Sequence, residues 1–430
     1  MSLTALRPRP SAARTASAAP APGRKPRSSV VLLVFVLGLL SATSSLATDL
    51  YLPAFPSIAA DLGATQSQVQ LTLTAIMIGL AVGQLAIGPM SDRWGRRGPL
   101  LVGVAVFTLS SLACAVAPSV EALSVLRFVQ GLAAAAGAVI SRAVVRDTFD
   151  GDDGARFFSR LVLLVGLAPM LGPMLGGQLL LVGSWRLIFV ALAVAGLVNL
   201  AFVFFGLPET LSREQRGQRG QRGRGSLRVL VRLLLDVRFI APSLIMALSF
   251  AMTFTYISAF SFVSHDEFGT TPQQFSLIFG VNSLGMVLGN QVNAALIGRM
   301  DTSRRLLAGL VGSLASVGVL AALALTGGAS LVSVTAVLFV MMFCTGLISP
   351  NATTLAIAGQ PASVAGAGSA LLGTLQFAIG GGLAAVTGMG EGGQASIVSM
   401  SGVMLATAAA ALAVFVVQAY LGSARRSARV

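Results

Sequence analysis

Charged residues are scarce in this sequence. Of its 430 residues, 10% are Asp, Glu, Lys or Arg, whereas 55% are hydrophobic and the mean hydropathy is +0.84. Soluble domains carry about a quarter charged residues, so this chain has too little charge to cover several water-facing surfaces. The scarcity excludes a cytosolic enzyme, a disordered protein and a secreted disulfide scaffold, and it predicts an all-α polytopic membrane protein.

Cysteine and histidine are also rare. Cys114 and Cys344 are the only cysteines and lie in apolar stretches, so we interpret them as small buried side chains rather than a disulfide or metal pair. His265 is the only histidine, which excludes a site built from several histidines. No nucleophile with a base and no nucleotide-binding glycine loop stands out. We therefore expect no enzyme activity, no cofactor and no metal.

Long apolar runs dominate the rest of the chain. A helix needs about 20 apolar residues to cross the roughly 30 Å hydrocarbon core of a membrane. Runs of this length, bounded by charged, Gly, Pro or polar clusters, predict twelve transmembrane helices. They lie near residues 29–52, 68–90, 99–118, 121–144, 158–182, 187–207, 239–263, 273–297, 304–326, 330–352, 363–388 and 396–421.

The positions of the basic residues predict the topology. Short cytoplasmic loops of membrane proteins are rich in Lys and Arg. If the N-terminus is cytoplasmic, all of the 29 basic residues except Arg127 and Arg186 fall on the cytoplasmic side. We therefore expect a multi-pass protein of the cell membrane with both termini in the cytoplasm. The net charge of +14 then reflects the membrane topology and does not indicate nucleic-acid binding.

The longest polar connection divides the spans into two sets of six. We predict a disordered cytoplasmic tail, a six-helix half, a basic cytoplasmic linker, a second six-helix half and a short C-terminal tail. Their bounds are 1–28, 29–207, 208–238, 239–421 and 422–430. A linker between transporter halves explains the basic loop, and contact of that loop with anionic lipid is compatible with it as well. We expect the chain to act as a monomer.

A charged, glycine-rich turn follows the second span, between Gly83 and Arg97. A loop that merely obeys the topology rule would explain its arginines, but neither its glycines nor Asp92. The turn resembles the signature of the major facilitator superfamily, and a weaker copy at 298–305 indicates an internal duplication. The resemblance implies a cytoplasmic latch between the halves, with Asp92 near the positive N-terminus of the eleventh helix at Ser363. The expected latch residues are Gly88, Asp92, Arg93, Gly95, Arg96 and Arg97.

Asp49 and Arg127 are the two charged residues that cannot be placed in a loop, a tail or the end of a predicted span. An ionisable group within the membrane indicates function by default, and the similar depths of these two permit a pair across one cavity. Burial disfavours the ionised form of a carboxyl group, whereas a nearby arginine favours it. The balance of the two suits a proton carrier. The alternatives are an interfacial helix-end carboxylate for Asp49 and a structural hydrogen-bonding role for Arg127.

The fifth span is rich in glycine. Glycines four residues apart allow close helix contact, and a proline kinks the helix, so the spacing alone fits ordinary tight packing equally well. The segment is similar to the glycine motif of the exporter branches of the superfamily, which implies antiport and a seal against leakage. The residues concerned are Gly166, Gly172, Pro173, Gly176 and Gly177.

Six residues are candidates for substrate binding. Aromatic residues of the seventh span form a stripe, which is more often core or lipid-facing than a ligand site. The alternative is an adaptable apolar pocket. The second half has no charge inside a span, so its contribution would be apolar, aromatic or amide. The candidates are Tyr51, Gln130, Phe254, Tyr256, Asn282 and Gln376.

Stretches in both halves resemble the bicyclomycin and chloramphenicol resistance (Bcr/CflA) subgroup of proton-coupled drug exporters. They include 48–53, 83–97, 127–131, 256–259 and 350–353. The resemblance implies antiport of protons against a small drug by alternating access, with Asp49, Arg127 and Gln130 in proton handling. An importer or a metabolite exporter is the second hypothesis, because a fold does not fix a function. The expected partners are a drug molecule, protons and the lipid bilayer, without nucleic acid.

Overall fold

The computed structural model describes residues 27–148, 169–211, 226–361, 364–384 and 394–427, and all regular secondary structure within these ranges is helical. In chain order the helices are α1 (Arg27–Asp49), the 3-10 helix η1 (Leu52–Ala54), α2 (Phe55–Leu62), α3 (Gln66–Trp94), α4 (Arg97–Ala115), α5 (Val120–Thr148), an unlabelled helix (Pro169–Val182), α7 (Arg186–Gly206), α9 (Ser226–Leu235), α10 (Val237–Phe268), α11 (Pro272–Ala295), α12 (Thr302–Leu325), α13 (Leu331–Ala358), α14 (Ala365–Ala384) and α15 (Ile397–Ser427).

These helices confirm a polytopic membrane protein. Ten segments of the described chain are long and apolar enough to cross a membrane, the first being Phe35–Leu62. Two shorter apolar helices, Pro169–Val182 and Ala367–Leu383, lie within the predicted fifth and eleventh spans. Both lie beside residues outside the described ranges. Ten of the predicted spans therefore correspond to helices of spanning length, and the fifth and eleventh each overlap a shorter apolar helix.

The first span is longer than predicted. Its expected end was residue 52, but helical structure continues through η1 and α2 to Leu62. Pro53 and Pro56 lie in the first turns of η1 and α2, where a missing N–H is tolerated, so these prolines start new helices rather than terminating the span. The segment ends at Gly63, whose φ of 60° is left-handed. Asp49 consequently lies further from the end of the membrane segment than its distance from Pro53 indicated.

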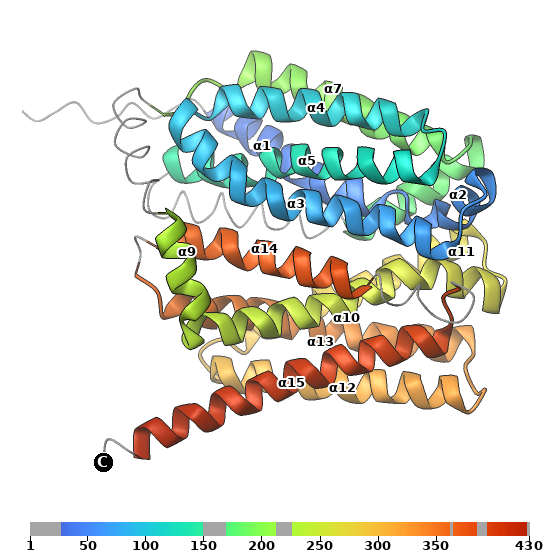
Figure 1. Ribbon diagram of the computed structural model, residues 1–430, viewed down its shortest axis with the longest axis vertical. Helices are drawn as coiled ribbons and strands as arrows, with labels where there is room; N and C mark the ends of the chain where they lie inside the picture. The colour runs from blue at the N-terminus through green and yellow to red at the C-terminus, as the bar shows by residue number, and fades with distance from the viewer. Residues whose placement is uncertain (1–26, 149–168, 212–225, 362–363, 385–393, 428–430) are drawn as a thin grey trace, which may run out of the picture.

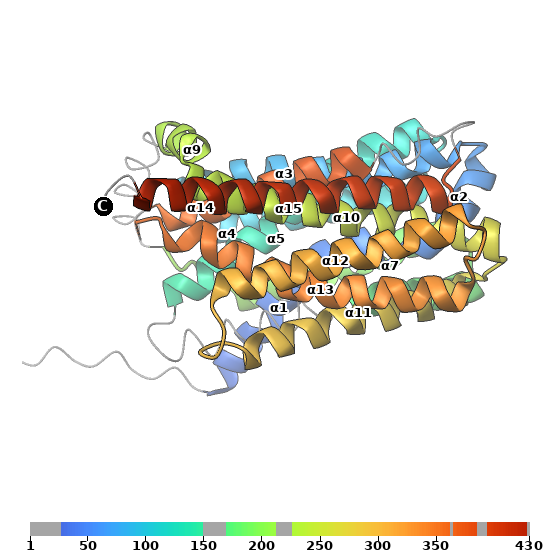
Figure 2. The same cartoon turned by 90° about the horizontal axis from the view of Figure 1, so that it is seen from below.

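The helices form two groups that lie side by side along a common direction (Figures 1 and 2). In the first group α1, α3, α4, α5 and α7 pack together, and in the second α10 to α15 do so. The start of α1 and the end of α15 lie at the same end of the bundle, on the left in Figure 1. We call this the basic end, since the Arg93–Arg97 turn lies there, and the other the distal end.

The two groups share one apolar core that extends to the distal end. It joins residues of the first group, such as Phe55 and Phe189, to residues of the second, such as Phe262 and Phe279. Towards the basic end the second group has separate small clusters around Ile245 and Phe239. The shared apolar core thus joins the two groups at the distal end, and α3 and α14 form a second contact between them.

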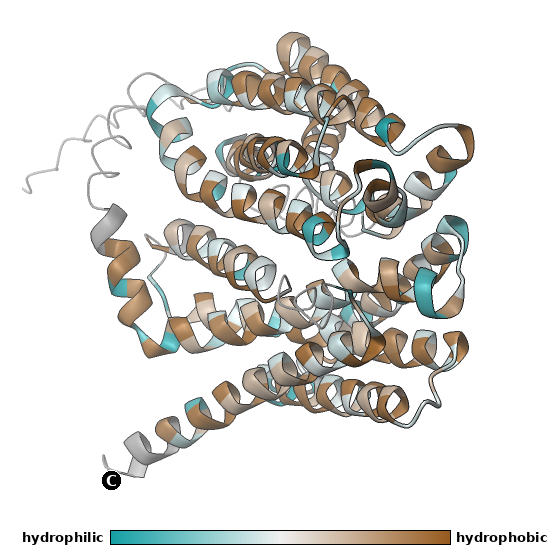
Figure 3. Ribbon diagram, turned by 45° about the vertical axis from the view of Figure 1, so that its right-hand side comes forward, coloured by the Kyte–Doolittle hydropathy of each residue, from teal (hydrophilic) through white to brown (hydrophobic). Residues whose placement is uncertain are grey.

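The outward faces of the helices are apolar along their length. Figure 3 shows hydrophobic residues along the spans and hydrophilic ones gathered towards the helix ends. Leu109, Val194, Phe205 and Val319 are among the large apolar side chains that lie exposed on these faces. Such surfaces suit a hydrocarbon environment, in which helices satisfy their own backbone hydrogen bonds.

Candidate functional site

Asp49 is the last residue of α1 and is buried, with 7% of its surface exposed. The Thr48 hydroxyl donates a hydrogen bond to Asp49 Oδ1 at 3.0 Å. The chain then turns through Leu50 and Tyr51 into η1. Asp49 thus lies at a break between helices within the first membrane segment, where a carboxyl group is held inside the protein rather than at its surface.

Arg127 of α5 is fully buried close to this break. Its Cζ lies 3.9 Å from the centroid of the Tyr51 ring, which provides a cation–π contact. Its Nη1 donates to Gln130 Oε1 at 2.6 Å, and Gln130 Nε2 donates to Ser111 Oγ of α4 at 2.7 Å. Among the ion pairs of the described residues, none joins Arg127 to Asp49. The structure therefore places Arg127 over Tyr51, two residues after Asp49, without a direct ion pair between the two charges.

The glycines of the Pro169–Val182 helix lie directly against the Asp49 region. A Cβ added at Gly172 would lie 2.9 Å from Asp49 Cβ, and one added at Gly176 would overlap the Leu50 carbonyl oxygen. Only glycine permits this approach of the two backbones. Gly166, the other glycine of the predicted motif, lies outside the described residues.

The same short helix also contacts the second group. Ser276 of α11 donates from Oγ to the Pro173 carbonyl oxygen at 2.7 Å, and Gln273 Nε2 donates to the Gly177 carbonyl oxygen at 3.0 Å. A Cβ at Gly177 would overlap Ser276 Oγ. One helix therefore touches Asp49 on one side and the opposite group on the other. The glycine spacing indicated close packing, but it could not indicate that Ser276 is the partner.

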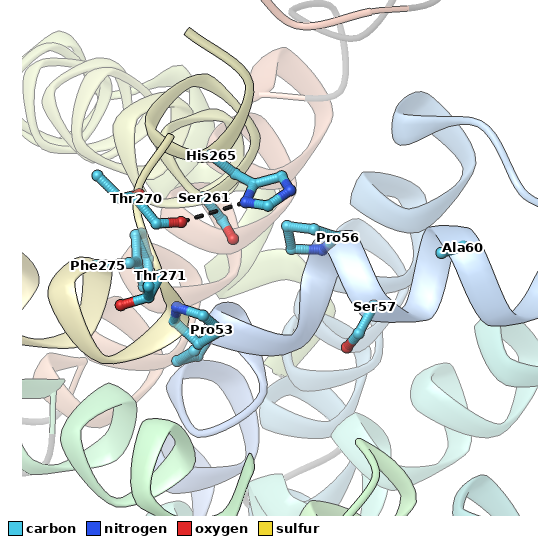
Figure 4. Close-up of a pocket in the computed structure, with 10 residues that line it drawn as sticks. Pro53, Pro56, Ser57, Ala60, Ser261, His265, Thr270, Thr271 and Phe275 are labelled. Carbon is cyan, nitrogen blue, oxygen red and sulfur yellow. Dashed lines mark hydrogen bonds between the residues drawn. The ribbon is translucent and has the colours of Figure 1, made fainter. Parts of the chain in front are cut away.

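Further contacts at the distal end link η1 and α2 to α10 and α11. Ser261 Oγ donates to the Leu52 carbonyl oxygen at 2.7 Å, and the rings of Phe55 and Phe262 lie 5.7 Å apart. A pocket of about 280 Å³ lies between these helices, with Pro53, His265 and Phe275 in its lining (Figure 4). The two groups thus meet closely around this pocket.

The predicted substrate residues of the second group lie in buried clusters. Tyr256 stacks on Phe279 with centroids 5.7 Å apart, and Asn282 Nδ2 donates to Tyr256 Oη at 2.9 Å. Phe254 instead stacks on Phe250, at 5.5 Å. Both Tyr256 and Phe254 are buried in this arrangement, and their part in substrate binding stays a prediction.

Two further candidates lie on other helices. Gln376 is half-buried on α14. Tyr51 Oη shares a hydrogen bond of 3.1 Å with Thr72 Oγ1 of α3. The structure therefore brings Tyr51 together with Arg127 and Gln130, and Tyr256 together with Asn282. Within the described ranges, no hydrogen bond joins Gln376 to either set.

Arg96 is the centre of the charged turn at the basic end. Gly95, with φ of 94°, terminates α3, and the Arg96 side chain that follows is almost fully buried. Its Nη2 lies 2.7 Å from Asp92 Oδ1 and its Nε 2.9 Å from Asp147 Oδ2 of α5, while Nη1 donates to Ser91 Oγ at 2.6 Å. Asp147, which the sequence analysis did not place in the site, is thus a principal partner.

The start of α4 is also held by a carboxylate. Glu209, after α7, accepts the backbone N–H groups of Arg96 and Arg97 at 2.9 and 3.2 Å, as a negative charge at a helix N-terminus favours. Arg93 is exposed in the last turn of α3, and a Cβ at Gly88 would meet nothing within 4 Å. These partners of Arg96 and Arg97 belong to the first group. The predicted contact of Asp92 with the eleventh helix stays a prediction, because Ser363 lies outside the described residues.

The second group contains a corresponding corner in which the buried arginine is held by neutral groups. The buried Arg305 donates from Nη1 to Asn293 Oδ1 at 2.8 Å and from Nε to the Met300 carbonyl oxygen at 3.1 Å. Asn351 Nδ2 donates to the same Asn293 Oδ1 at 2.7 Å. Among the described residues no carboxylate forms an ion pair with Arg305. The spacing Gly289-x-x-x-Asn293 repeats that of Gly88-x-x-x-Asp92, a signal that the sequence analysis missed.

Comparison with known proteins identifies the family. The sequence model of the Major Facilitator Superfamily matches residues 37–385. The chain belongs to this superfamily. Its members are transporters rather than enzymes, and the resemblance drawn from the charged turn is confirmed.

Several curated proteins resemble this major facilitator over most of its length. It is 37% identical to the "Uncharacterized MFS-type transporter YdgK" of Bacillus subtilis (strain 168), over 87% of this chain and 92% of that protein. It is 32% identical to a "Bicyclomycin resistance protein homolog" of Haemophilus influenzae, over 82% and 87%. A "Chloramphenicol resistance protein" of Pseudomonas aeruginosa is 31% identical over 61% of each chain. The Bcr/CflA-like resemblance is therefore confirmed.

A solved structure confirms the fold. A bacterial homologue of the lysosomal transporter Spinster superposes with a TM-score of 0.68 at 15% identity, covering 92% of this chain and 96% of its own. At this identity the likeness concerns the arrangement of the helices alone. The all-α, major facilitator architecture expected from the sequence is thus correct.

We expect Asp147→Asn to destabilise this major facilitator by about 3 kcal/mol, because it removes one carboxylate from a buried arginine. The Asp147 side chain is only 4% exposed. The measurement is the thermal unfolding midpoint of the purified protein. The matched control is Asp301→Asn, whose carboxylate is 80% exposed and lies 3.8 Å from Arg304, a surface pair of little energetic value. Equal midpoints for the two variants would show that the Arg96 pairs do not stabilise the fold.

Proposed function

We propose that the protein is a proton-coupled exporter of small, largely apolar or amphipathic drugs, of the chloramphenicol or bicyclomycin kind. Two six-helix halves, 29–207 and 239–421, would alternate in access to the two sides of the membrane. The names of two relatives, a bicyclomycin resistance protein homolog and a chloramphenicol resistance protein, support drug export. The buried carboxyl group of Asp49 supports proton coupling.

The contact of Gly172 with Asp49 is the observation that carries this proposal. The helix that holds Gly172 also accepts hydrogen bonds from Gln273 and Ser276 of the second group. The Pro169–Val182 helix therefore connects the Asp49 side chain, with its carboxyl group, directly to the contact between the halves. Protonation and release of this group would bias the position of the Pro169–Val182 helix, and so the opening of the distal end.

Arg127 would complete the proton site. Its cation lies over Tyr51, two residues after Asp49, so an ionised Asp49 has a positive charge in its vicinity without a permanent ion pair. An unpaired but nearby cation stabilises the ionised carboxylate less than a direct pair does. This arrangement suits a group that must both bind and release a proton in each cycle.

The orientation follows from the basic residues. With the basic end on the cytoplasmic side, both termini are cytoplasmic, and the contacts at the distal end close the route to the outside. The substrate route would then open towards the cytoplasm, from which a drug is collected. Tyr51, Gln130, Phe254, Tyr256, Asn282 and Gln376 remain our candidates for its lining.

The test of this function is drug resistance together with proton flux. Expression in a host that lacks its own drug pumps should raise resistance to chloramphenicol-like or bicyclic peptide antibiotics relative to the empty plasmid. Addition of the drug to energised cells should alkalinise the external medium, because each drug molecule leaves in exchange for protons. Accumulation of a nutrient without resistance would instead establish an importer, and resistance without proton flux would remove the coupling.

A further inference from the structure

The linker between the two groups contains a helix that the sequence analysis did not predict. Helix α9 (Ser226–Leu235) runs across the direction of the spans in Figure 1 and is seen end-on in Figure 2, at the edge of the bundle near the basic end. A single residue, Asp236, separates it from α10. Asp236 Oδ1 accepts the backbone N–H of Arg238 at 3.0 Å, and its Oδ2 accepts Gln360 Nε2 at 2.8 Å. The angle between α9 and the span is thus fixed by hydrogen bonds.

One side of α9 packs into the second group. Leu233 is buried in a cluster with Phe239 of α10 and Leu371 of α14, and Val229 and Leu230 pack against the same cluster. At 3.6 residues per turn, these three positions of α9 share one side of the helix. This side attaches α9 to the protein.

The opposite side of α9 is also apolar. Val231, Leu234 and Leu235 are 48%, 42% and 78% exposed, and their spacing places them together, away from the packed side. A helix that lies flat at the membrane surface buries such a face in the boundary between headgroups and acyl chains. Helix α9 lies at the edge of the bundle and directly before a span, which places it near this boundary.

Cations accompany this apolar side. Arg232 and Arg238 are exposed, and the stretch from 213 to 238 contains eight arginines against two acids, Glu214 and Asp236. Clusters of arginine beside a membrane segment attract anionic headgroups. The positive charge of the segment is therefore complementary to an anionic lipid surface. Its exposed apolar face also favours lipid over a soluble acidic protein, because acyl chains can bury that face.

We infer that α9 is an interfacial helix that binds anionic phospholipid. Val231, Leu234 and Leu235 insert among the acyl chains, and Arg232 and Arg238 contact the headgroup phosphates. The inference is independent of the transported substrate. It has a structural consequence, because α14, on which α9 packs, also meets the first group.

The contacts of α14 show how lipid would act on the rest of the molecule. Thr374 Oγ1 donates to the Ala81 carbonyl oxygen of α3 at 3.3 Å, and Thr74 Oγ1 of α3 donates to the Gly381 carbonyl oxygen at 3.1 Å. Lipid bound by α9 would therefore stabilise α14, a helix of the second group that packs against α3 of the first group.

Insertion is tested by fluorescence. In full-length protein with Cys114→Ser and Cys344→Ser, an NBD dye on Leu235→Cys should emit at shorter wavelength in phosphatidylcholine–phosphatidylglycerol nanodiscs. Lipid carrying a nitroxide in its acyl chain should quench it. The matched site is Asp301→Cys, 80% exposed on the α11–α12 connection near the same end, which should show the spectrum of a dye in water. Identical, unquenched spectra at both sites would overturn the inference. So would shielding that appears only when cell extract is added, since that would assign the face to a protein.

The charge contribution is tested by lipid composition. Arg232→Gln combined with Arg238→Gln should raise the phosphatidylglycerol fraction needed for half-maximal quenching at least twofold. The control pair is Arg299→Gln with Arg304→Gln, which removes two exposed arginines from the α11–α12 region and should leave that fraction unchanged. If both pairs shift this fraction equally, the effect comes from the net charge of the protein and not from α9, and the headgroup contact is overturned. It is also overturned if the first pair leaves the fraction unchanged.

Discussion

Asp49→Asn is expected to abolish drug transport driven by a pH gradient, down to the rate of protein-free vesicles. Asn has nearly the same shape, and its Oδ1 can still accept the hydrogen bond that Thr48 donates to Asp49, so the fold should persist. It cannot bind or release a proton in the physiological range, and the driving force is lost with that step. Exchange of labelled for unlabelled drug across the membrane, which needs no net proton movement, should survive. Proteoliposomes with an imposed pH gradient measure both.

Asp61→Asn is the matched control for this variant. Asp61 lies on α2, twelve residues further along the same membrane segment, and is an exposed partner of Arg186 and Trp185. Its replacement should leave gradient-driven transport close to the wild-type rate. If Asp49→Asn transports drug with unchanged dependence on the gradient, the proton site must lie elsewhere.

Gly176→Ala is expected to produce the second large effect, by separating the Pro169–Val182 helix from the end of α1. The new Cβ would overlap the Leu50 carbonyl oxygen, and a backbone atom cannot rotate away. Overpacking of this kind costs about 1–3 kcal/mol. If the cost falls on the closed distal end alone, the equilibrium between conformations shifts roughly 5- to 150-fold. A single cysteine at Thr270, which is buried at the distal pocket, should then react faster with an impermeant thiol reagent.

Gly318→Ala provides the comparison. Gly318 lies within α12, and a Cβ there would meet nothing within 4 Å, so the substitution should change neither the labelling of Thr270→Cys nor transport. Wild-type labelling and transport in Gly176→Ala would contradict the tight contact with Leu50. Faster labelling in both variants would reveal a general loss of stability.

The ten long spans could be predicted because hydrocarbon thickness dictates the length of an apolar run. The ends of the spans were less accessible. Pro53 was taken as the end of the first span, but a proline also begins a helix, and only the packing of α2 against its neighbours distinguishes the two. Helix α9 was missed because the Arg-Gly repeats before it dominate the composition of the linker. Its own pattern, leucine and valine on two sides with Arg228 and Arg232 between, was a usable signal.

The chemistry of the site was predictable one residue at a time, but its pairings were not. Asp49 and Arg127 were found because membrane burial of a charge is costly. The stacking of Arg127 on the Tyr51 ring depends on how α1 and α5 cross. Ser276 carries no charge and has no distinctive spacing, so its hydrogen bond to Pro173 could not be anticipated. The pairing of Asp147 with Arg96 depends on how α3, α4 and α5 meet at the basic end.

The corners around Arg96 and Arg305 differ in one chemical respect. Arg96 is held by the carboxylates of Asp92 and Asp147, whereas Arg305 is held by the amide of Asn293 and by neutral oxygens. An amide carries no charge, so the cation of Arg96 is paired with carboxylates and the cation of Arg305 is held by neutral dipoles. Although the two corners share one spacing, they therefore differ in charge: ion pairs hold the first together, and neutral hydrogen bonds hold the second.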